Sequence, residues 1–138
     1  MKKIFADTAG WGHLIDSTQK YHELAASIYK DSKRKGYRFI TSNYIVSELV
    51  ALMISPLHLQ HSFAVEFINS MKLSSHVEII HIDQLLDEQA WILFSRRRDK
   101  QWSLVDCSSF VIMQKYGITE CFTTDKHFEQ AGFIRLLK

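Results

Sequence analysis

The sequence has no long apolar run, and none of its stretches approaches the ~18 continuous apolar residues that a membrane helix needs. The N-terminal segment carries Lys2 and Lys3 but no apolar run long enough for a signal peptide. Proline occurs once, at Pro56, and there is no Ser/Gly-rich linker, low-complexity segment or internal repeat. We therefore expect one domain over residues 1–138, in the cytoplasm and without a membrane segment.

Cysteine and net charge are also scarce. Cys107 and Cys121 form no CxxC pair and have no histidine at zinc-ligand spacing, so we expect two reduced thiols in the core, as in a reducing compartment. The net charge of +2 is smaller than that of most nonspecific nucleic-acid binders. Any argument for nucleic-acid binding must therefore come from the local distribution of charge.

Short apolar runs alternate along the chain with longer segments of helical periodicity. The runs predict strands at Ile4–Ala6, Arg38–Thr41, Val77–Ile82, Cys121–Thr123 and Phe133–Leu137. The periodic segments predict helices over Gln19–Lys35, from Ser42 or Asn43 to about Ile54, then Leu57–Leu73, Gln84–Arg97, Ser103–Tyr116 and Lys126–Ala131. Strands separated by helices favour right-handed crossovers, so we predict an α/β fold with a central parallel sheet flanked by helices.

Four acidic residues occupy unusual positions in this pattern. Asp7 and Asp125 directly follow predicted strands, at the edge where open parallel sheets bind ligands. Glu48 and Asp106 lie on predicted helices among apolar neighbours, where a charge is costly unless it is paired or bound to a metal. Together they predict an acidic site.

Four carboxylates in one site would repel one another unless a hard divalent cation offset their charge. Mg²⁺ or Mn²⁺ bound there could support in-line cleavage of a phosphodiester bond. The sequence offers no Ser-His-Asp or Cys-His pattern and no Gly-rich phosphate loop as an alternative.

Each acid also has a purely structural interpretation. Ser103 and Asp106 have the spacing of a capping box, and Asp125 could cap the helix beginning at Lys126. Asp7 could close a turn, and Glu48 could pair with a surface lysine or arginine. A cap can also present a metal ligand, so the two interpretations are compatible.

Four segments carry a resemblance to a known family. They are Phe5-Ala6-Asp7-Thr8, Ser47-Glu48-Leu49, Trp102-Ser103-Leu104-Val105-Asp106-Cys107, and the stretch from Thr123-Thr124-Asp125 to Phe133. In this order they resemble the PIN-domain superfamily, and in particular the VapC-like toxins of prokaryotic toxin–antitoxin pairs. The resemblance covers essentially the whole chain, and its last two motifs are the most specific.

The resemblance implies a PIN-like three-layer sandwich with a five-stranded parallel sheet, commonly a homodimer, and a metal-dependent endoribonuclease that acts as a toxin beside a small antitoxin. A PIN protein that processes or binds RNA without an antitoxin is the alternative. The family pattern carries over to Asp7, Glu48, Asp106 and Asp125 as catalytic ligands of Mg²⁺ or Mn²⁺. The supporting polar residues would be Thr8, Ser103, Thr123 and Thr124.

The most concentrated basic segment lies just before the Asp106 motif. Arg96, Arg97, Arg98 and Lys100 are candidates to hold the RNA backbone, and Trp102 could stack on a base. The alternatives are a solvated helix end for the cations and core packing for Trp102. Asp99 is a weaker candidate for an outer acid of the site, and for His127 a surface or capping role is favoured over substrate contact.

Overall fold

The computed structural model describes residues Met1–Lys138 and contains a five-stranded sheet in the order β3-β2-β1-β4-β5. The strands are β1 (Lys3–Ala6), β2 (Arg38–Ser42), β3 (Val77–Ile80), β4 (Glu120–Phe122) and β5 (Ile134–Arg135). Every neighbouring pair is parallel, and Phe5 at the centre pairs with Ile40 on one side and Cys121 on the other. The predicted α/β fold with a parallel sheet is confirmed.

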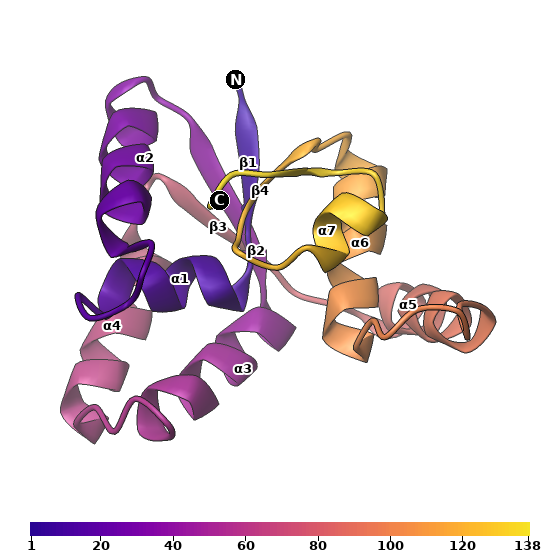
Figure 1. Cartoon of the computed structure of the whole chain (residues 1–138), viewed down its shortest axis with the longest axis horizontal. Helices are drawn as coiled ribbons and strands as arrows, with labels where there is room; N and C mark the ends of the chain where they lie inside the picture. The colour runs from indigo at the N-terminus through magenta and orange to yellow at the C-terminus, as the bar shows by residue number, and fades with distance from the viewer.

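Helices cover both faces of this sheet (Figure 1). The helices α1 to α4 lie on one side, and α5 to α7 lie on the other. Their bounds are α1 (Thr8–Ile15), α2 (His22–Arg34), α3 (Asn43–Ile54), α4 (His61–Leu73), α5 (Gln84–Arg96), α6 (Leu104–Tyr116) and α7 (His127–Gln130). This is the expected three-layer sandwich. No helix is both long and apolar enough to span a membrane.

Aromatic side chains fill the core on each side of the sheet. Trp11 of α1 packs against Phe39 and Phe122, with ring centroids 6.2 and 6.3 Å away. Phe110 of α6 packs edge-on against Phe128 at 5.0 Å, which joins α6 to α7. The two cysteines are buried and unpaired, as predicted. Burial of this apolar surface is the main force that holds the helices to the sheet.

The helix α1 was not predicted, and its glycines explain the omission. Gly10 and Gly12 weaken helix propensity by about 1 kcal/mol each relative to alanine. The structure shows what Gly10 is for, because a Cβ at this position would lie 2.0 Å from the carbonyl oxygen of Phe122. Its lack of a side chain lets α1 lie directly against β4.

Several predicted boundaries were also wrong: α2 begins at His22 and not at Gln19, and β3 ends at Ile80 and not at Ile82. The helix α4 begins at His61 and not at Leu57, because His58 has a φ of +52°, which a right-handed helix does not allow. The strand β5 spans Ile134–Arg135 and not Phe133–Leu137. The chain beyond it still follows β4, since the Leu136 and Leu137 amides donate to the carbonyls of Cys121 and Thr123 at 3.0 and 3.1 Å.

The strands β1 and β4 lie beside the point in the sheet where the helical connections switch from one side of β1 to the other. The crossovers through α1 to α4 run from β1 toward β3, whereas the one through α5 and α6 returns to β4 on the other side of β1. Parallel α/β sheets bind ligands at the carboxyl ends of strands at such a point. Asp7 follows β1 and Thr123 follows β4, and the Asp7 amide donates to the Phe122 carbonyl at 3.2 Å.

Candidate active site

Asp7 is a buried carboxylate at the end of β1. It directly precedes α1, and only 5% of its surface is exposed. Its Oδ2 accepts a hydrogen bond of 2.8 Å from Thr123 Oγ1. Burial raises the pKa of Asp7 to about 7; the nearby charges of Asp106 and Asp125 add to the rise, and the Thr123 hydrogen bond opposes it. Asp7 therefore shares one electrostatic environment with two of the other predicted acids.

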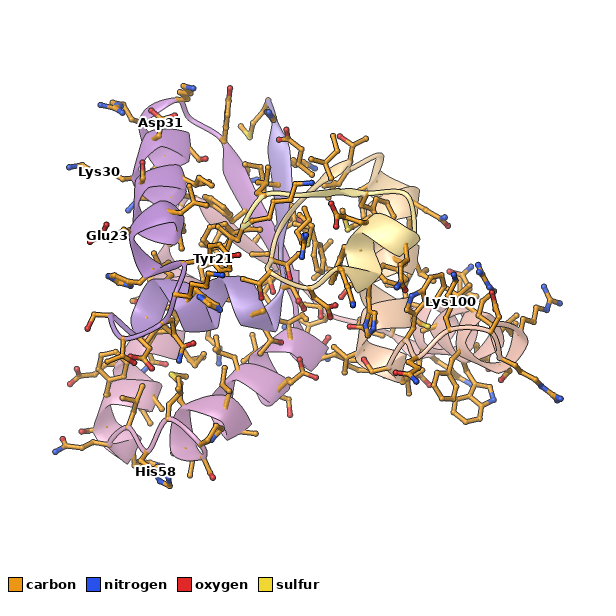
Figure 2. All side chains as sticks on the ribbon, viewed as in Figure 1. Tyr21, Glu23, Lys30, Asp31, His58 and Lys100 are labelled. Atoms are coloured by element: carbon orange, nitrogen blue, oxygen red, sulfur yellow. The ribbon has the colours of Figure 1, made fainter.

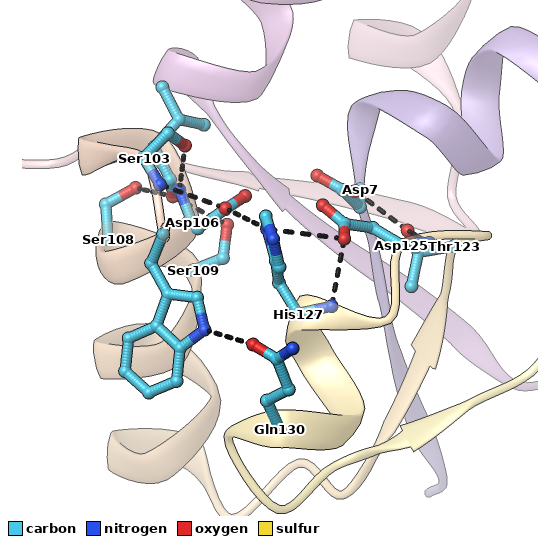
Figure 3. A network of polar contacts seen from close by, with 11 residues as sticks. Asp7, Ser103, Asp106, Ser108, Ser109, Thr123, Asp125, His127 and Gln130 are labelled. Carbon is cyan, nitrogen blue, oxygen red and sulfur yellow. Dashed lines mark hydrogen bonds and ion pairs between the residues drawn. The ribbon is translucent and has the colours of Figure 1, made fainter. Parts of the chain in front are cut away.

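Asp106 has the structural role that its spacing predicted. The Ser103 side chain accepts from the Asp106 amide at 2.9 Å, and Asp106 Oδ2 accepts from the Ser103 amide at 3.0 Å, which completes a capping box at the start of α6. The same Oδ2 lies 3.0 Å from His127 Nδ1. The cap thus points Asp106 toward the loop between β4 and α7 (Figure 3).

Asp125 lies on that loop and is held by its neighbours. Its amide donates to Thr123 Oγ1 at 3.0 Å, so a single hydroxyl group contacts both Asp7 and the Asp125 backbone. Asp125 Oδ1 accepts from the His127 amide at 2.9 Å and lies 3.4 Å from His127 Nδ1. The N-cap of α7 is Lys126, so Asp125 satisfies one free amide of the helix without being its N-cap residue.

Glu48 approaches the cluster from α3. Its Oε1 accepts a hydrogen bond of 2.5 Å from Thr8 Oγ1, and Thr8 directly follows Asp7. The apolar neighbours of Glu48 suggested a buried charge, but the side chain is exposed, because Ile45 and Leu49 are the residues that α3 buries here. Glu48 forms no ion pair with a lysine or arginine.

A hydrogen bond holds one oxygen of each of the four carboxylates. The held atoms are Asp7 Oδ2, Glu48 Oε1, Asp106 Oδ2 and Asp125 Oδ1. Asp106, Asp125 and His127 each offer a ligand atom within 4.8 Å of the others. Carboxylate oxygens suit Mg²⁺ and Mn²⁺, and a cation would offset the charge that burial penalises at Asp7. The residues present therefore fit a divalent cation.

The basic segment divides into paired and unpaired side chains. Arg97 donates to both carboxylate oxygens of Asp99 at 3.0 and 3.1 Å and lies 4.7 Å from the centre of the Trp102 ring. Arg96 and Arg98 are exposed and form no ion pair, and Lys100 lies alongside α5 (Figure 2). The segment can present two or three free cations to a phosphate backbone.

The contacts of Trp102 do not match the RNA-contact role considered for it, and those of Thr124 do not match its expected supporting role. Trp102 is 6% exposed and donates from Nε1 to Gln130 Oε1 at 3.1 Å, so the alternative of core packing is confirmed. Thr124 contributes its carbonyl, which accepts from Arg135 at 2.9 Å, while its hydroxyl has no hydrogen bond. In contrast, Thr8 contacts Glu48 and Ser103 contacts Asp106, while Thr123 contacts both Asp7 and Asp125.

His127 is the residue that sequence reasoning undervalued. Its ring lies between Asp106 and Asp125, which come from elements nearly 20 residues apart in the chain. The signal available in the sequence was its position two residues after Asp125, at the start of a predicted short helix.

The sequence and structure match characterised proteins over nearly their full lengths. The family model described as PIN domain matches residues 4–134. The 23S rRNA-specific endonuclease VapC20 of Mycobacterium tuberculosis, from two strains, is 31% identical over 133 residues, which cover 96% of this chain and 97% of the relative.

Two solved structures agree with this relationship. The crystal structure of Mycobacterium tuberculosis VapC20, described as a sarcin-ricin loop cleaving toxin, superposes with a TM-score of 0.84 at 30% identity, covering 95% of this chain and 96% of that one. FitAcB from Neisseria gonorrhoeae, at 14% identity, shares the fold with a TM-score of 0.65 over 96% of each chain. The extent of these matches shows that the chain belongs to the PIN-domain family.

Proposed function

We propose that Asp7, Glu48, Asp106 and Asp125 bind Mg²⁺ or Mn²⁺ in the active centre of this protein, which is an endoribonuclease of the VapC toxin type. The observation that supports the proposal is that a hydrogen bond holds one oxygen of each acid, while Asp106 and Asp125 lie with His127 in a group whose ligand atoms are all within 4.8 Å of one another. Asp106 and Asp125 lie with His127 in one compact group, and their charges act on Asp7, whereas acids that served only as caps would not need to gather at one edge of the sheet.

The chain's own contribution to the chemistry is to orient these acids. A bound divalent cation supplies activation of water and stabilisation of the leaving oxygen. Thr123 fixes the Asp7 carboxylate, the amide of Ser103 fixes Asp106, and Thr8 fixes Glu48. Because these donors lie at or next to the ends of helices and strands, they limit the rotation of each carboxylate before a cation or substrate arrives.

We propose ribosomal RNA as the substrate class, which places the protein's action in the cytoplasm. VapC20, which is named for 23S rRNA, aligns with nearly the whole of this chain. Arg96, Arg98 and Lys100 supply the positive charge that an RNA backbone requires. A small antitoxin that occupies the acidic site and a homodimeric state are further proposals that rest on the VapC relationship.

Substitution of the free arginines tests the proposed RNA contact. Arg96→Ala combined with Arg98→Ala should weaken RNA binding by roughly 3- to 30-fold near physiological salt, and each lost phosphate contact should reduce the slope of log K against log salt by about 0.7. Fluorescence polarisation with labelled RNA, in an Asp106→Asn background that prevents cleavage, measures both quantities. Arg34→Ala, on the exposed surface of α2, is the matched control. Unchanged affinity and slope in the double variant would exclude this contact.

Removal of the metal tests the proposed site itself. Mn²⁺ at about 100 times its dissociation constant should stabilise the protein by about 2.7 kcal/mol, because the cation binds the folded acids and not the unfolded chain. Differential scanning calorimetry with and without Mn²⁺ measures this gain. RNA cleavage in the same buffers should stop on addition of EDTA and return with excess Mn²⁺. Full cleavage in EDTA would refute a metal-dependent site.

A further inference from the structure

We infer that His127 is a positioning residue of this active centre, where it ties Asp106 of α6 to Asp125 of the loop before α7. The inference rests on the proposed function and assigns a role to a residue outside the four acids. His127 Nδ1 lies 3.0 Å from Asp106 Oδ2 and 3.4 Å from Asp125 Oδ1, and Figure 3 shows the ring between the two carboxylates. No other side chain contacts both acids.

The two carboxylate partners of the His127 imidazole determine which ring nitrogen carries the hydrogen. Both atoms near Nδ1 are carboxylate oxygens, which only accept hydrogen bonds when ionised, so Nδ1 must carry the hydrogen. Asp106 Oδ2 then accepts from two donors, the Ser103 amide at 3.0 Å and His127 Nδ1 at 3.0 Å. Rotation of the Asp106 carboxylate would break both bonds, so together they keep Oδ1 as the oxygen available to a cation.

The position of the His127 ring is itself fixed by its surroundings. The backbone amide of His127 donates to Asp125 Oδ1 at 2.9 Å, which anchors the residue at the loop. The next residue, Phe128, is fully buried and packs 5.0 Å from Phe110, one turn after Asp106 on α6. This apolar contact sets the distance between α6 and α7, and across it the imidazole joins Asp106 of α6 to Asp125 of the loop before α7.

A pair of substitutions separates positioning from other roles. His127→Asn keeps a donor close to the place of Nδ1, whereas His127→Phe keeps a ring without any donor. Loss of an outer hydrogen bond to a metal ligand typically costs 10- to 100-fold in metal affinity or activity. We expect about this loss of Mn²⁺ affinity for His127→Phe and at most about a threefold loss for His127→Asn. His61→Phe, an exposed histidine on α4, is the control and should match the wild type.

The measurements are isothermal titration calorimetry with Mn²⁺, the thermal midpoint of the metal-free protein, and the cleavage rate as a function of Mn²⁺ concentration. Near-wild-type Mn²⁺ affinity in His127→Asn but not in His127→Phe, at similar thermal midpoints, supports positioning through the Nδ1 hydrogen. Equal losses in both variants would overturn the inference, because the imidazole itself would then be required. Wild-type affinity in His127→Phe would also overturn it.

Two further comparisons cover the cases in which His127→Phe does not fold or the wild type does not cleave RNA. If His127→Phe does not fold, His127→Gln replaces it, because the longer side chain of glutamine places its amide donor near the position of Nε2 and not of Nδ1. His127→Gln should then bind Mn²⁺ more weakly than His127→Asn. Equal Mn²⁺ affinities in these two variants would contradict the inference. If the wild type cleaves no RNA, the proposed function fails, but the order of Mn²⁺ affinities still tests the role of His127.

Discussion

Asp7→Asn should give a protein that is more stable than the wild type in the absence of metal and that no longer cuts RNA. The pKa of Asp7 is raised from 3.8 to about 7, first by burial and then by the charges of Asp106 and Asp125. Asparagine has nearly the same shape, keeps an oxygen for the Thr123 hydroxyl and carries no charge. The substitution therefore removes an electrostatic cost while leaving the packing in place.

The sign of the pH dependence follows from proton uptake. Between about pH 4 and pH 7 the folded protein keeps a proton on Asp7 that the unfolded chain has already released, so the Asp7 contribution lowers stability as pH rises through this window. Above pH 7 the cost is complete, with an upper limit of about 4 kcal/mol at about 1.4 kcal/mol per pKa unit. We expect Asp7→Asn to gain roughly 2–4 kcal/mol at pH 8 and little at pH 4.

Urea unfolding of metal-free protein at both pH values measures this gain. Cleavage should fall by at least about 100-fold, because a charged carboxylate oxygen of Asp7 is lost as a ligand. Asp99→Asn is the matched control, since Asp99 is exposed and pairs with Arg97 outside the cluster. A less stable Asp7→Asn protein at pH 8, or one with full activity, would contradict the assignment of Asp7.

Gly10→Ala should be among the most destabilising single substitutions in the chain, with a loss of roughly 3 kcal/mol or more. The added Cβ would lie 2.0 Å from the carbonyl oxygen of Phe122 and 2.6 Å from its Cδ2. That carbonyl is part of β4 and accepts from the Asp7 amide, so it cannot move without shifting the end of the strand that directly precedes Thr123. We therefore expect a loss of cleavage activity together with the loss of stability.

Gly12→Ala is the internal comparison, because it makes the same change two residues away from the close contact. Its Cβ would meet Leu52 Cδ2 at 3.0 Å, the end of a flexible side chain that can rotate away. The gain in helix propensity, up to about 1 kcal/mol, offsets part of that adjustment. Equal unfolding free energies for the two alanine variants in urea would contradict the proposed close packing of α1 on β4.

The elements with strong local signals were predicted correctly. The strand β1 and the capped helix α6 follow from an apolar run and a Ser103–Asp106 spacing, each contained within a few residues of sequence. The positions of Asp7 and Asp125 at one edge of the sheet follow from the parallel topology, which alternating strands and helices dictate. These parts of the site depend on local chemistry and on a general rule of chain connectivity.

The remaining features depend on contacts between distant segments. The helix α1 requires that Gly10 meet Phe122, and no property of residues 8–15 alone indicates this. The contact of His127 with Asp106 requires α6 and α7 to pack through Phe110 and Phe128. The exposure of Glu48 depends on which face of α3 the core accepts, and its apolar neighbours on both faces conceal that choice.

The central claim is that the carboxylates form one metal-dependent ribonuclease centre, and Asp106→Asn tests it most directly. Asparagine at position 106 can still accept from the Ser103 amide, so the capping box and α6 should remain. Purified wild type and variant are incubated with ribosomes in Mn²⁺, and the ribosomal RNA is resolved for discrete fragments. Fragments from the wild type alone, lost again in EDTA, are the predicted result. The same fragments from Asp106→Asn, or from the wild type in EDTA, would contradict the claim.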